Sequence, residues 1–529
     1  RGEGRRRRRR ARCARQEPAC RAKLTEGNGS MDVREYDNWI DGGWAGADRK
    51  VERKSPAHGR LLARFAQSDE HAVKAAVGVA RKAFDTRSVW SSLPGAERAK
   101  ALGRWIDLMI RDTDRLALIE AEEVGKPIRF AKAEIEWSIE LARYAAALAW
   151  QIPGDLVSNV GDANLGLVTR EPRGVIAMIT PWNFPMVTLF QKLPFALAAG
   201  CTVVIKPSEL TSGSTLEIAK LATEAGIPNG VINVVTGSGR TVGEILTGHR
   251  DVDMISFTGS TAVGIRIAQR AAEQVKRVGL ELGGKAANIV FADADIDAAL
   301  DGILLGYILN QGEECVQGTR LLVEDSIADS FLEKLVERSK KIRLGLPTDE
   351  QADVGALIHE KHMDQVLAYI KSGIDEGATL LLGGNRVTEN GLGMGYYVAP
   401  TIFSNVTPDM TIFREEIFGP VLAVTRFRSV EEAIALANDT NYGLGNGLWT
   451  KDIDKAIRVS RELRSGTVYV NTFLETAVQM PFGGFKQSGL GRENGLDGLL
   501  EFTEVKSTFI KLGNRTHALP HTLTASARS

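Results

Sequence analysis

Cys315 is the residue of this sequence best suited by its type and setting to nucleophilic chemistry. It lies in the polar segment 310–320, between an apolar run predicted to be helical, 298–309, and a β-rich run, 321–324. Backbone N–H groups behind a glycine can face such a sulfur and favour the thiolate, the form that attacks a carbonyl carbon. The alternative is a buried packing cysteine, since free cysteine is among the most buried residue types.

Glu281 offers a second catalytic group. It opens the segment Glu-Leu-Gly-Gly-Lys at 281–285, whose two glycines allow a ligand or backbone to come close. A cysteine that forms an acyl intermediate needs a base to activate water, and a carboxylate can be that base.

Together these two segments resemble the non-acylating aldehyde dehydrogenases, and the resemblance extends from about Asn38 to about Lys511. It implies an NAD(P)-dependent oxidoreductase in which Cys315 adds to an aldehyde, hydride passes to the nicotinamide, and Glu281 activates water to hydrolyse the thioester. Family members that pass the acyl group to coenzyme A lack this glutamate, so Glu281 implies a free carboxylic acid as the product.

Asn183 and Lys206 complete the predicted catalytic set. The resemblance gives Asn183, with the backbone N–H of Cys315, the role of oxyanion hole, in which one side-chain amide contributes roughly 3 kcal/mol. An unplaced asparagine is more often a turn residue.

The resemblance also assigns Lys206 and Glu209, after a β-rich run, to the adenosine ribose. A carboxylate there repels a 2′-phosphate, which favours NAD over NADP, and NADP is the alternative. Without that context a Lys/Glu pair is usually solvated.

Two glycine-rich stretches compete for the dinucleotide. Residues 237–243 have one residue too many before the third glycine, whereas residues 257–264 close a strand and open a helix, so that the pyrophosphate can meet free N–H groups. A plain N-cap is the alternative for Ser260. The resemblance places Glu416 on the second ribose and Phe418 behind the nicotinamide. The full predicted cofactor set is Thr180, Trp182, Lys206, Ser208, Glu209, Gly239, Gly243, Phe257, Gly259, Ser260, Gly264, Leu282, Glu416 and Phe418.

The segment 471–476 lies where the family lines the substrate entrance. Phe184, Phe473 and Phe482 with Glu475 are similar in type to the betaine-aldehyde and aminoaldehyde members, because aromatic faces and a carboxylate suit a cationic end group. A general aliphatic or aromatic aldehyde is the alternative, and Glu475 is as easily a solvated loop residue. The sequence departs from a common form of the family at Glu313, where many members have glutamine. This carboxylate either raises the thiol pKa by repulsion or faces away.

Composition limits the class of protein. The 529 residues are 43% hydrophobic and 25% charged, with no apolar run of membrane-spanning length, so we expect a globular protein in the cytoplasm without membrane or nucleic-acid partners. The single close histidine pair lacks further ligands, so we expect no metal. The six-arginine block at 5–10 is typical of disorder; it could bind nucleic acid or mark an organelle transit peptide, but we favour neither role and expect residues 1–30 to lie outside the fold.

The predicted fold is α/β, with a Rossmann-like parallel sheet, a second α/β unit and a small β hairpin. β-rich runs at 174–180, 202–206, 231–236 and 253–258 alternate with helical runs at 186–199, 212–225, 241–247 and 263–274. Helices are also expected at 72–84, 96–111, 112–124 and 132–149. The predicted domains are a basic extension (1–30), an NAD-binding domain (31–150 and 173–281), a catalytic domain (282–480), an oligomerisation hairpin and strand (151–172 and 500–513) and a tail (514–529). The resemblance implies that the hairpin and strand join across subunits of a homodimer or homotetramer.

Two other function classes are open. A cysteine hydrolase without redox chemistry leaves the 257–264 motif and the Lys206/Glu209 pair unexplained. A non-catalytic binding protein on the same scaffold is disfavoured by the joint presence of Cys315, Glu281 and Asn183.

Overall fold

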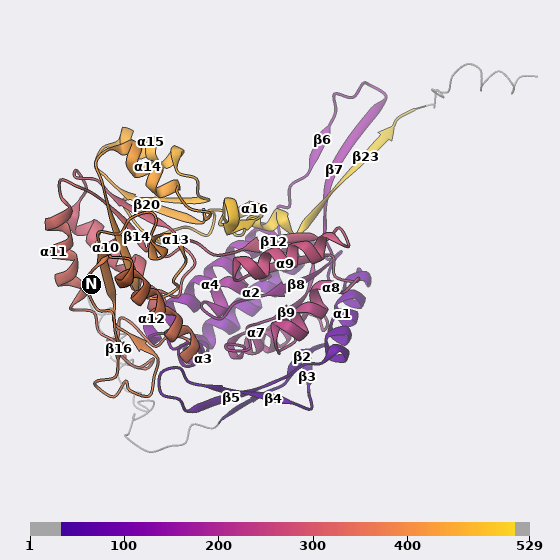
Figure 1. Cartoon of the computed structure of the whole chain (residues 1–529). Coiled ribbons are helices and arrows are strands. Elements are labelled where there is room, and N and C mark those ends of the chain that lie inside the picture. Colours follow the sequence, from indigo (N-terminus) through magenta and orange to yellow (C-terminus); the bar gives the residue numbers. More distant parts are fainter. Residues whose placement is uncertain (1–32, 514–529) are drawn as a thin grey trace, which may run out of the picture. The chain divides into compact units, whose positions relative to one another are not determined.

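Two large sheets with parallel cores organise residues 33–513, the part of the chain that the computed structural model describes (Figure 1). The predicted extension 1–30 and tail 514–529 lie outside the described residues. The α/β class with a Rossmann-like parallel sheet is confirmed, and the predicted domain boundaries stay predictions.

The first sheet has the strand order β22-β12-β11-β8-β9-β10-β2-β3. Its parallel core is β8 (Val175–Ile179), β9 (Thr202–Lys206), β10 (Ile232–Val234), β11 (Met254–Thr258) and β12 (Arg277–Glu281). Antiparallel strands β2 (Asn38–Ile40), β3 (Gly43–Ala45) and β22 (Gly489–Leu490) form its edges. The chain passes from β8 to β9 and β10 on one side, and to β11 and β12 on the other. The strand order therefore reverses between β8 and β11, where open sheets of this kind bind ligands.

Both faces of this sheet are covered, which explains why its strands are continuous apolar runs. On β8, Ile176 and Met178 pack into one core with helices α2, α4, α6 and α7, whereas Val175 and Ala177 pack into another with α1, α8 and α9. The helix bounds are α1 (Glu70–Asp85), α2 (Gly95–Arg111), α3 (Thr113–Val124), α4 (Ile128–Leu148), α5 (Pro185–Phe190), α6 (Leu193–Ala199), α7 (Gly213–Glu224), α8 (Glu244–Gly248) and α9 (Thr261–Ala272).

Two predicted helices differ in detail. The run predicted as one helix at 186–199 is two, α5 and α6, because Pro194 has no N–H and its ring clashes with the carbonyl four residues earlier, so it fits only in the first turn of α6. The helix predicted at 241–247 starts as a π-helical turn, Gly239–Gly243, and continues as α8.

The second sheet has the order β15-β18-β19-β14-β13-β20-β21, and β15 is its one antiparallel strand. Its strands are β13 (Ala287–Val290), β14 (Arg320–Glu324), β15 (Thr379–Leu382), β18 (Thr401–Ser404), β19 (Val421–Phe427), β20 (Gly445–Trp449) and β21 (Thr467–Val470). The helices of this part are α10 (Ile296–Ile308), α11 (Ala328–Ser339), α12 (Glu360–Asp375), α13 (Thr411–Arg414), α14 (Val430–Asn438) and α15 (Ile453–Glu462). The last helix, α16 (Gly495–Glu501), packs against α4 and α6 beside the first sheet.

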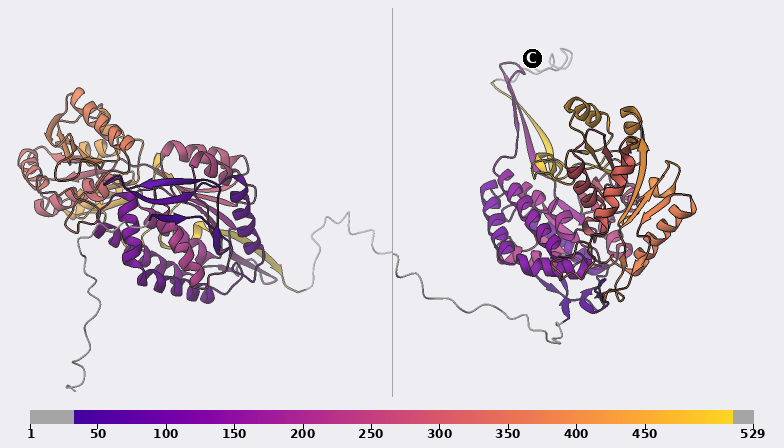
Figure 2. Two further views of the ribbon diagram at one scale, coloured as in Figure 1. Left: turned by 90° about the horizontal axis from the view of Figure 1, so that it is seen from below. Right: turned by 90° about the vertical axis from the view of Figure 1, so that its left-hand side faces the viewer.

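Three smaller β structures complete the described chain. β1 (Arg34–Tyr36), β5 (Leu61–Ala66) and β4 (Lys50–Lys54) form one sheet, and β16 (Arg386–Val387) pairs with β17 (Tyr397–Val398). The third is a ribbon of β6 (Asp155–Val157), β7 (Asn164–Pro172) and β23 (Thr503–Lys511), which extends away from the helices around the first sheet (Figures 1 and 2).

The pairing within this ribbon joins two distant segments of the same chain. β23 pairs with β7 from Thr503 opposite Pro172 to Lys511 opposite Asn164, and the expected role of the ribbon between subunits stays a prediction. These nine antiparallel residue pairs bring together two segments that lie far apart in the sequence. Separately, no helix in the described range 33–513 is both long enough and apolar enough to cross a membrane.

Candidate active site

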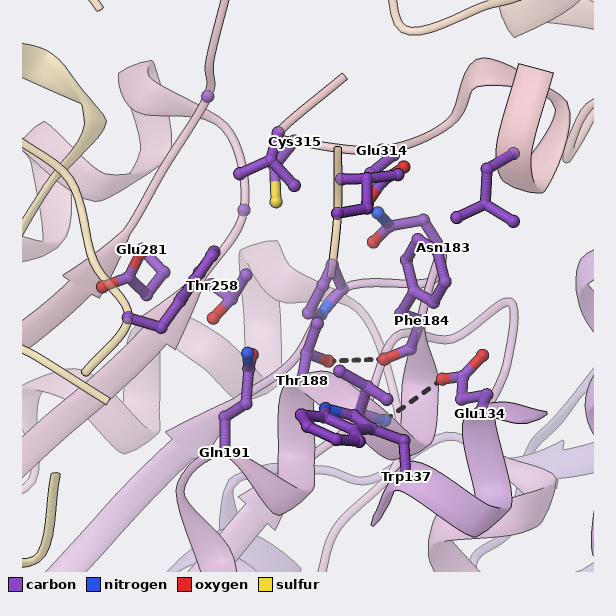
Figure 3. Close-up of a pocket in the computed structure, with 18 of the residues that line it drawn as sticks. Glu134, Trp137, Asn183, Phe184, Thr188, Gln191, Thr258, Glu281, Glu314 and Cys315 are labelled. Carbon is purple, nitrogen blue, oxygen red and sulfur yellow. Dashed lines mark hydrogen bonds between the residues drawn. The ribbon is translucent and has the colours of Figure 1, made fainter. Parts of the chain in front are cut away.

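Cys315 and Glu281 line one cavity of about 630 Å³ together with Asn183 (Figure 3). Six predicted cofactor residues line the same cavity: Trp182, Gly259, Ser260, Leu282, Glu416 and Phe418. The two segments that carry the predicted chemistry, 34 positions apart on the chain between Glu281 and Cys315, thus meet at the strand-order reversal of the first sheet.

A left-handed turn presents Cys315 to the cavity. Asn310, Gln311 and Gly312 have φ of 50°, 59° and 74°, a conformation that costs energy for residues other than glycine. A Cβ on Gly312 would lie 2.3 Å from the Gly419 carbonyl carbon, so the turn passes directly over that backbone. Gln317 holds the far side of the loop by donating from Nε2 to the carbonyl oxygens of Tyr307 (2.9 Å) and Gly419 (3.0 Å).

The surroundings of Cys315 raise its thiol pKa well above the ordinary value. Burial is the main cause, and the carboxyl groups of Glu314, Glu416 and Glu281 add to it, while a backbone hydrogen bond at Cys315 acts in the opposite direction. The backbone hydrogen bond favours the thiolate as expected, but burial and three acidic neighbours outweigh it, so the thiol pKa is raised.

Glu281 is at the end of β12 and is 3% exposed. In the described part of the chain neither of its carboxyl oxygens accepts a hydrogen bond. Its pKa is raised well above the ordinary value by burial and by Glu493, which outweigh the opposing effect of Lys192. Lys192 and Glu493 form a buried ion pair behind it. A carboxyl group with a raised pKa that is free of partners is suited to take a proton from water near neutral pH.

The loop 481–489 anchors the segment after Glu281. Ser488 accepts a hydrogen bond from the Leu282 N–H (2.9 Å) and donates from its hydroxyl to the Gly283 carbonyl (2.6 Å).

Asn183 follows β8, and its side chain points toward the Cys315 loop (Figure 3). Its Nδ2 donates to the Glu313 carbonyl at 2.9 Å, which leaves the second amide N–H available to an oxygen in the cavity. Its backbone carbonyl accepts from Lys126 Nζ and from Asn310 Nδ2, both at 2.9 Å. The proposed oxyanion donor is therefore held from both sides.

Sequence reasoning missed the ion pair that supports this turn. Lys126 pairs with Glu134 in the interior. Glu134 Oε1 accepts from the backbone N–H groups of Met186 and Val187, both at 3.1 Å, at the start of α5. The available signal was a glutamate on the buried stripe of the predicted helix 132–149, where Glu134, Ser138 and Leu141 follow one another at helical spacing.

The residues at the carboxyl ends of the first sheet fit a dinucleotide. Thr180 and Thr258 have buried hydroxyls without a partner among the described residues. Lys206 is 4% exposed and donates to the Pro207 carbonyl (2.8 Å), and burial lowers the pKa of its ammonium to about 8. Such unpaired donors at strand ends suit the hydroxyl and phosphate oxygens of NAD.

Ser260 is the N-cap residue of α9, yet its side chain makes no capping hydrogen bond. The plain N-cap alternative is therefore wrong, and the first N–H groups of α9 are open to an anion. Gly264 packs against Leu282, since a Cβ there would lie 2.3 Å from Leu282 Cδ2. In the same way a Cβ on Gly259 would lie 2.5 Å from the ring of Phe257, which is buried beneath the turn.

The other predicted cofactor residues lie away from the Cys315 cavity. Gly239 and Gly243 are in the π-helical turn, where a Cβ on Gly243 would lie 3.9 Å from Lys206 Cδ. Ser208 is half-buried and Glu209 is exposed just after β9. These residues flank Lys206 rather than Cys315.

Glu416 and Phe418 lie on the other wall of the cavity. Glu416 Oε1 accepts from the Gly284 N–H at 2.9 Å, and burial raises the pKa of this carboxyl to about 7. The rings of Phe418 and Trp182 meet edge to face at 5.5 Å, with His362 against both. His362 Nε2 lies 2.7 Å from the Phe418 carbonyl, so the phenylalanine is fixed from two directions.

The substrate end differs from prediction at one residue. Phe184, Phe482 and Glu475 line the cavity, but Phe473 is 2% exposed and packs in the core against Gly306 and Gly447. Three glycines, with Gly318 as the third, leave the space that its ring fills, so a residue predicted at the mouth is a packing residue. Lining residues that the sequence did not reveal include Phe130, Trp137, Gln191, Tyr469 and Leu474.

The two glutamates before Cys315 face different environments. Glu313 points away from the cavity: its carboxyl accepts from the Ile358 N–H (2.9 Å) and from Gln311 Nε2 (3.2 Å). Glu314 lines the cavity instead. Glu313 therefore faces away from the thiol, and the carboxyl groups that raise the thiol pKa are those of Glu314, Glu416 and Glu281.

A family model and several known proteins match most of this chain. The aldehyde dehydrogenase family model matches residues 44–508. A betaine aldehyde dehydrogenase of Bacillus subtilis is 44% identical over 473 residues, 89% of this chain and 96% of its own. The crystal structure of an NAD-dependent aldehyde dehydrogenase from Sinorhizobium meliloti is 45% identical with a TM-score of 0.90, covering 92% of this chain and 97% of its own. An indole-3-acetaldehyde dehydrogenase solved with NAD+ is 43% identical with a TM-score of 0.88, covering 92% and 98%. With a fold and a site of this kind, the chain belongs to the aldehyde dehydrogenase family.

Proposed function

We propose that this protein oxidises an aldehyde to the free carboxylic acid with NAD+ as the hydride acceptor. The observation that carries the proposal is that Cys315, Asn183 and Glu281 line one cavity, next to the uncapped start of α9 at Ser260. A nucleophile, an oxyanion donor and a base for water thus converge beside an anion-binding helix terminus.

Each catalytic residue has a separate role in the reaction. The Cys315 thiol loses its proton to solvent, its sulfur forms a bond to the aldehyde carbon, and the electron pair of the C=O bond moves to the oxygen. The oxygen that becomes negative accepts hydrogen bonds from Asn183 Nδ2 and the Cys315 N–H. When bound, NAD+ removes a hydride from that carbon, which leaves a thioester on Cys315. Glu281 then takes a proton from a water molecule as its oxygen attacks the thioester carbon, and the acid leaves while the thiol is restored.

The cofactor assignment rests on the unpaired hydroxyls of Thr180 and Thr258, on the buried ammonium of Lys206 and on the α9 terminus. The Sinorhizobium meliloti protein is NAD-dependent and the indole-3-acetaldehyde dehydrogenase was solved with NAD+, which supports the same cofactor here. Glu209 is exposed beside Lys206, where a carboxylate repels a 2′-phosphate, so we propose NAD+ in preference to NADP+.

For the substrate we propose an aldehyde with a cationic end group, of the betaine-aldehyde or aminoaldehyde type. Aromatic side chains of Phe130, Trp137, Phe184 and Phe482 line the cavity, with Glu475 at its edge. A general aliphatic or aromatic aldehyde is the second candidate. It is favoured by the place of Phe473 in the core and by the hydrogen bond that the exposed Glu475 accepts from Thr472 (2.6 Å).

We also propose a homodimer or homotetramer in the cytosol. The ribbon of β6, β7 and β23 exposes Leu156 (64%), Val505 (57%) and Phe509 (67%), apolar area of the kind that a second subunit covers. A thiol nucleophile must stay reduced, which suits the cytosol. Light scattering of the purified protein tests the assembly, and a monomer at micromolar concentration would contradict it.

A panel of aldehydes with NAD+ and NADP+ tests the function. We expect NADH to form with betaine aldehyde, an aminoaldehyde, hexanal and benzaldehyde, fastest with the cationic compounds and with NAD+. Cys315→Ser is expected to abolish NADH formation, whereas Cys201→Ser, a change in the core at a thiol that bonds to the Phe502 carbonyl, retains it. A flat substrate profile would contradict the cationic substrate, and an active Cys315→Ser enzyme would contradict the mechanism.

A further inference from the structure

Glu314 is a buried carboxyl group that the proposed mechanism leaves without a role. It lines the cavity immediately before Cys315 and is 8% exposed. Within residues 33–513 its Oε2 is enclosed and has no hydrogen-bond partner. In Figure 3 it lies beside Asn183, on the other side of Cys315 from Glu281.

The other carboxyl groups of the cavity are already accounted for. Glu134 is paired with Lys126, Glu416 accepts from Gly284, and Glu475 is exposed at the edge. A buried polar group without a partner destabilises a protein, so an unpartnered carboxyl in a cavity points to a ligand that supplies the missing donor.

We propose that Glu314 selects aldehydes whose far end carries a primary ammonium group, by accepting an N–H hydrogen bond from that group. This inference rests on the proposed aldehyde dehydrogenase function and narrows its substrate class. The side chains of Trp137 and Phe184 line the same cavity and provide apolar contact for the methylene carbons between the two ends of the substrate.

The charge of Glu314 supports this choice. Burial raises the pKa of its carboxyl to about 8, while Lys126 acts in the opposite direction. The Glu314 carboxyl is therefore largely neutral at pH 7. An ammonium ion placed against it favours the ionised form, so binding releases a proton and creates a charge-assisted hydrogen bond. A trimethylammonium group has no N–H to donate, and an alkyl end leaves the carboxyl unpaired.

The test compares 3-aminopropanal with butanal, in which a methyl group replaces the ammonium group, and with betaine aldehyde. The ratio of kcat/KM for 3-aminopropanal to that for butanal is measured with NAD+ in the wild type and in Glu314→Gln, Glu314→Asp and Glu475→Gln. Because hydrogen bonds to charged groups are worth more than neutral ones, we expect Glu314→Gln to lower the ratio by about 10- to 100-fold. Glu475→Gln at the exposed edge should lower it by about threefold at most.

Glu314→Asp keeps a carboxylate and should retain part of the preference, which a purely structural role does not predict. The wild type should also favour 3-aminopropanal over betaine aldehyde. A ratio that is unchanged in Glu314→Gln while butanal is still oxidised would overturn this inference and leave the proposed function in place. Absence of NADH with every aldehyde in the wild type would overturn both.

Discussion

Replacement of Glu281 by glutamine separates the two halves of the proposed reaction. The amide has nearly the volume of the carboxyl but cannot take a proton from water. Addition of Cys315 to the aldehyde and loss of hydride do not use Glu281, so one NADH should form rapidly per active site. Hydrolysis of the thioester should then limit the rate.

The size of the effect follows from the role and setting of this side chain. A positioned general base contributes about 10²- to 10⁴-fold. Lys192 and Glu493 pair with each other and not with Glu281. In the described part of the chain the Glu281 carboxyl accepts no hydrogen bond that would lower its pKa. We therefore expect the steady-state rate to fall by about 10³-fold, or roughly 4 kcal/mol in the activation free energy.

Stability gives an independent check with a definite sign. The folded-state pKa of Glu281 is raised above its unfolded value, so its ionisation opposes folding as pH rises from the unfolded pKa toward the folded one. Glutamine does not ionise. The free energy of unfolding of Glu281→Gln should thus equal or exceed that of the wild type at neutral and alkaline pH. This difference in favour of the variant should disappear as the pH falls below the unfolded pKa.

Stopped-flow absorbance of NADH measures the burst, and denaturant unfolding at two pH values measures the stability. Retention of a full burst with a slow second phase is the expected result. A steady-state rate within about threefold of the wild type, or loss of the burst itself, would show that Glu281 does not act as the base for hydrolysis.

Three further predictions concern the groups around this base. Asn183→Ala should lower kcat by about 10²- to 10³-fold through loss of the oxyanion donor, while alkylation of Cys315 by iodoacetamide changes little; equal loss of both would indicate a collapsed loop instead. Lys206→Met removes a buried ammonium that donates to the Pro207 carbonyl, so KM for NAD+ should rise about tenfold while the melting temperature stays level or rises. An unchanged KM for NAD+ would contradict its role. Glu134→Gln leaves Lys126 charged and unpaired in the interior and should cost about 3–5 kcal/mol in denaturant unfolding, and a cost below about 1 kcal/mol would refute the supporting role of this pair.

The sheet and its strand-end residues could be predicted because their signals are local. β9 was predicted at the residues it occupies, since a buried parallel strand is a continuous apolar run, and Gly259 and Ser260 follow a strand and precede a helix. The split between α5 and α6 was equally local, at Pro194, but helical spacing of apolar residues continued through it and concealed it.

The parts that could not be predicted depend on side-chain direction and on distant partners. Phe473 and Glu475 are two positions apart, yet one fills the space left by glycines of three other segments and the other reaches the cavity. The adjacent Glu313 and Glu314 likewise point in different directions, because a left-handed turn precedes them. The shift in the Cys315 pKa depends on Glu416, which comes from a remote loop. The spacing of residues along the chain does not predict these side-chain directions and long-range contacts.

The central claim is that the sulfur of Cys315 carries the acyl group. The most direct measurement is mass spectrometry of Glu281→Gln after mixing with NAD+ and butanal, acid quenching and proteolysis. The account predicts a butanoyl group on the peptide that contains Cys315 and none on the peptide that contains Cys201. NADH formation with an unmodified Cys315 peptide, or with the acyl group on another residue, would contradict it.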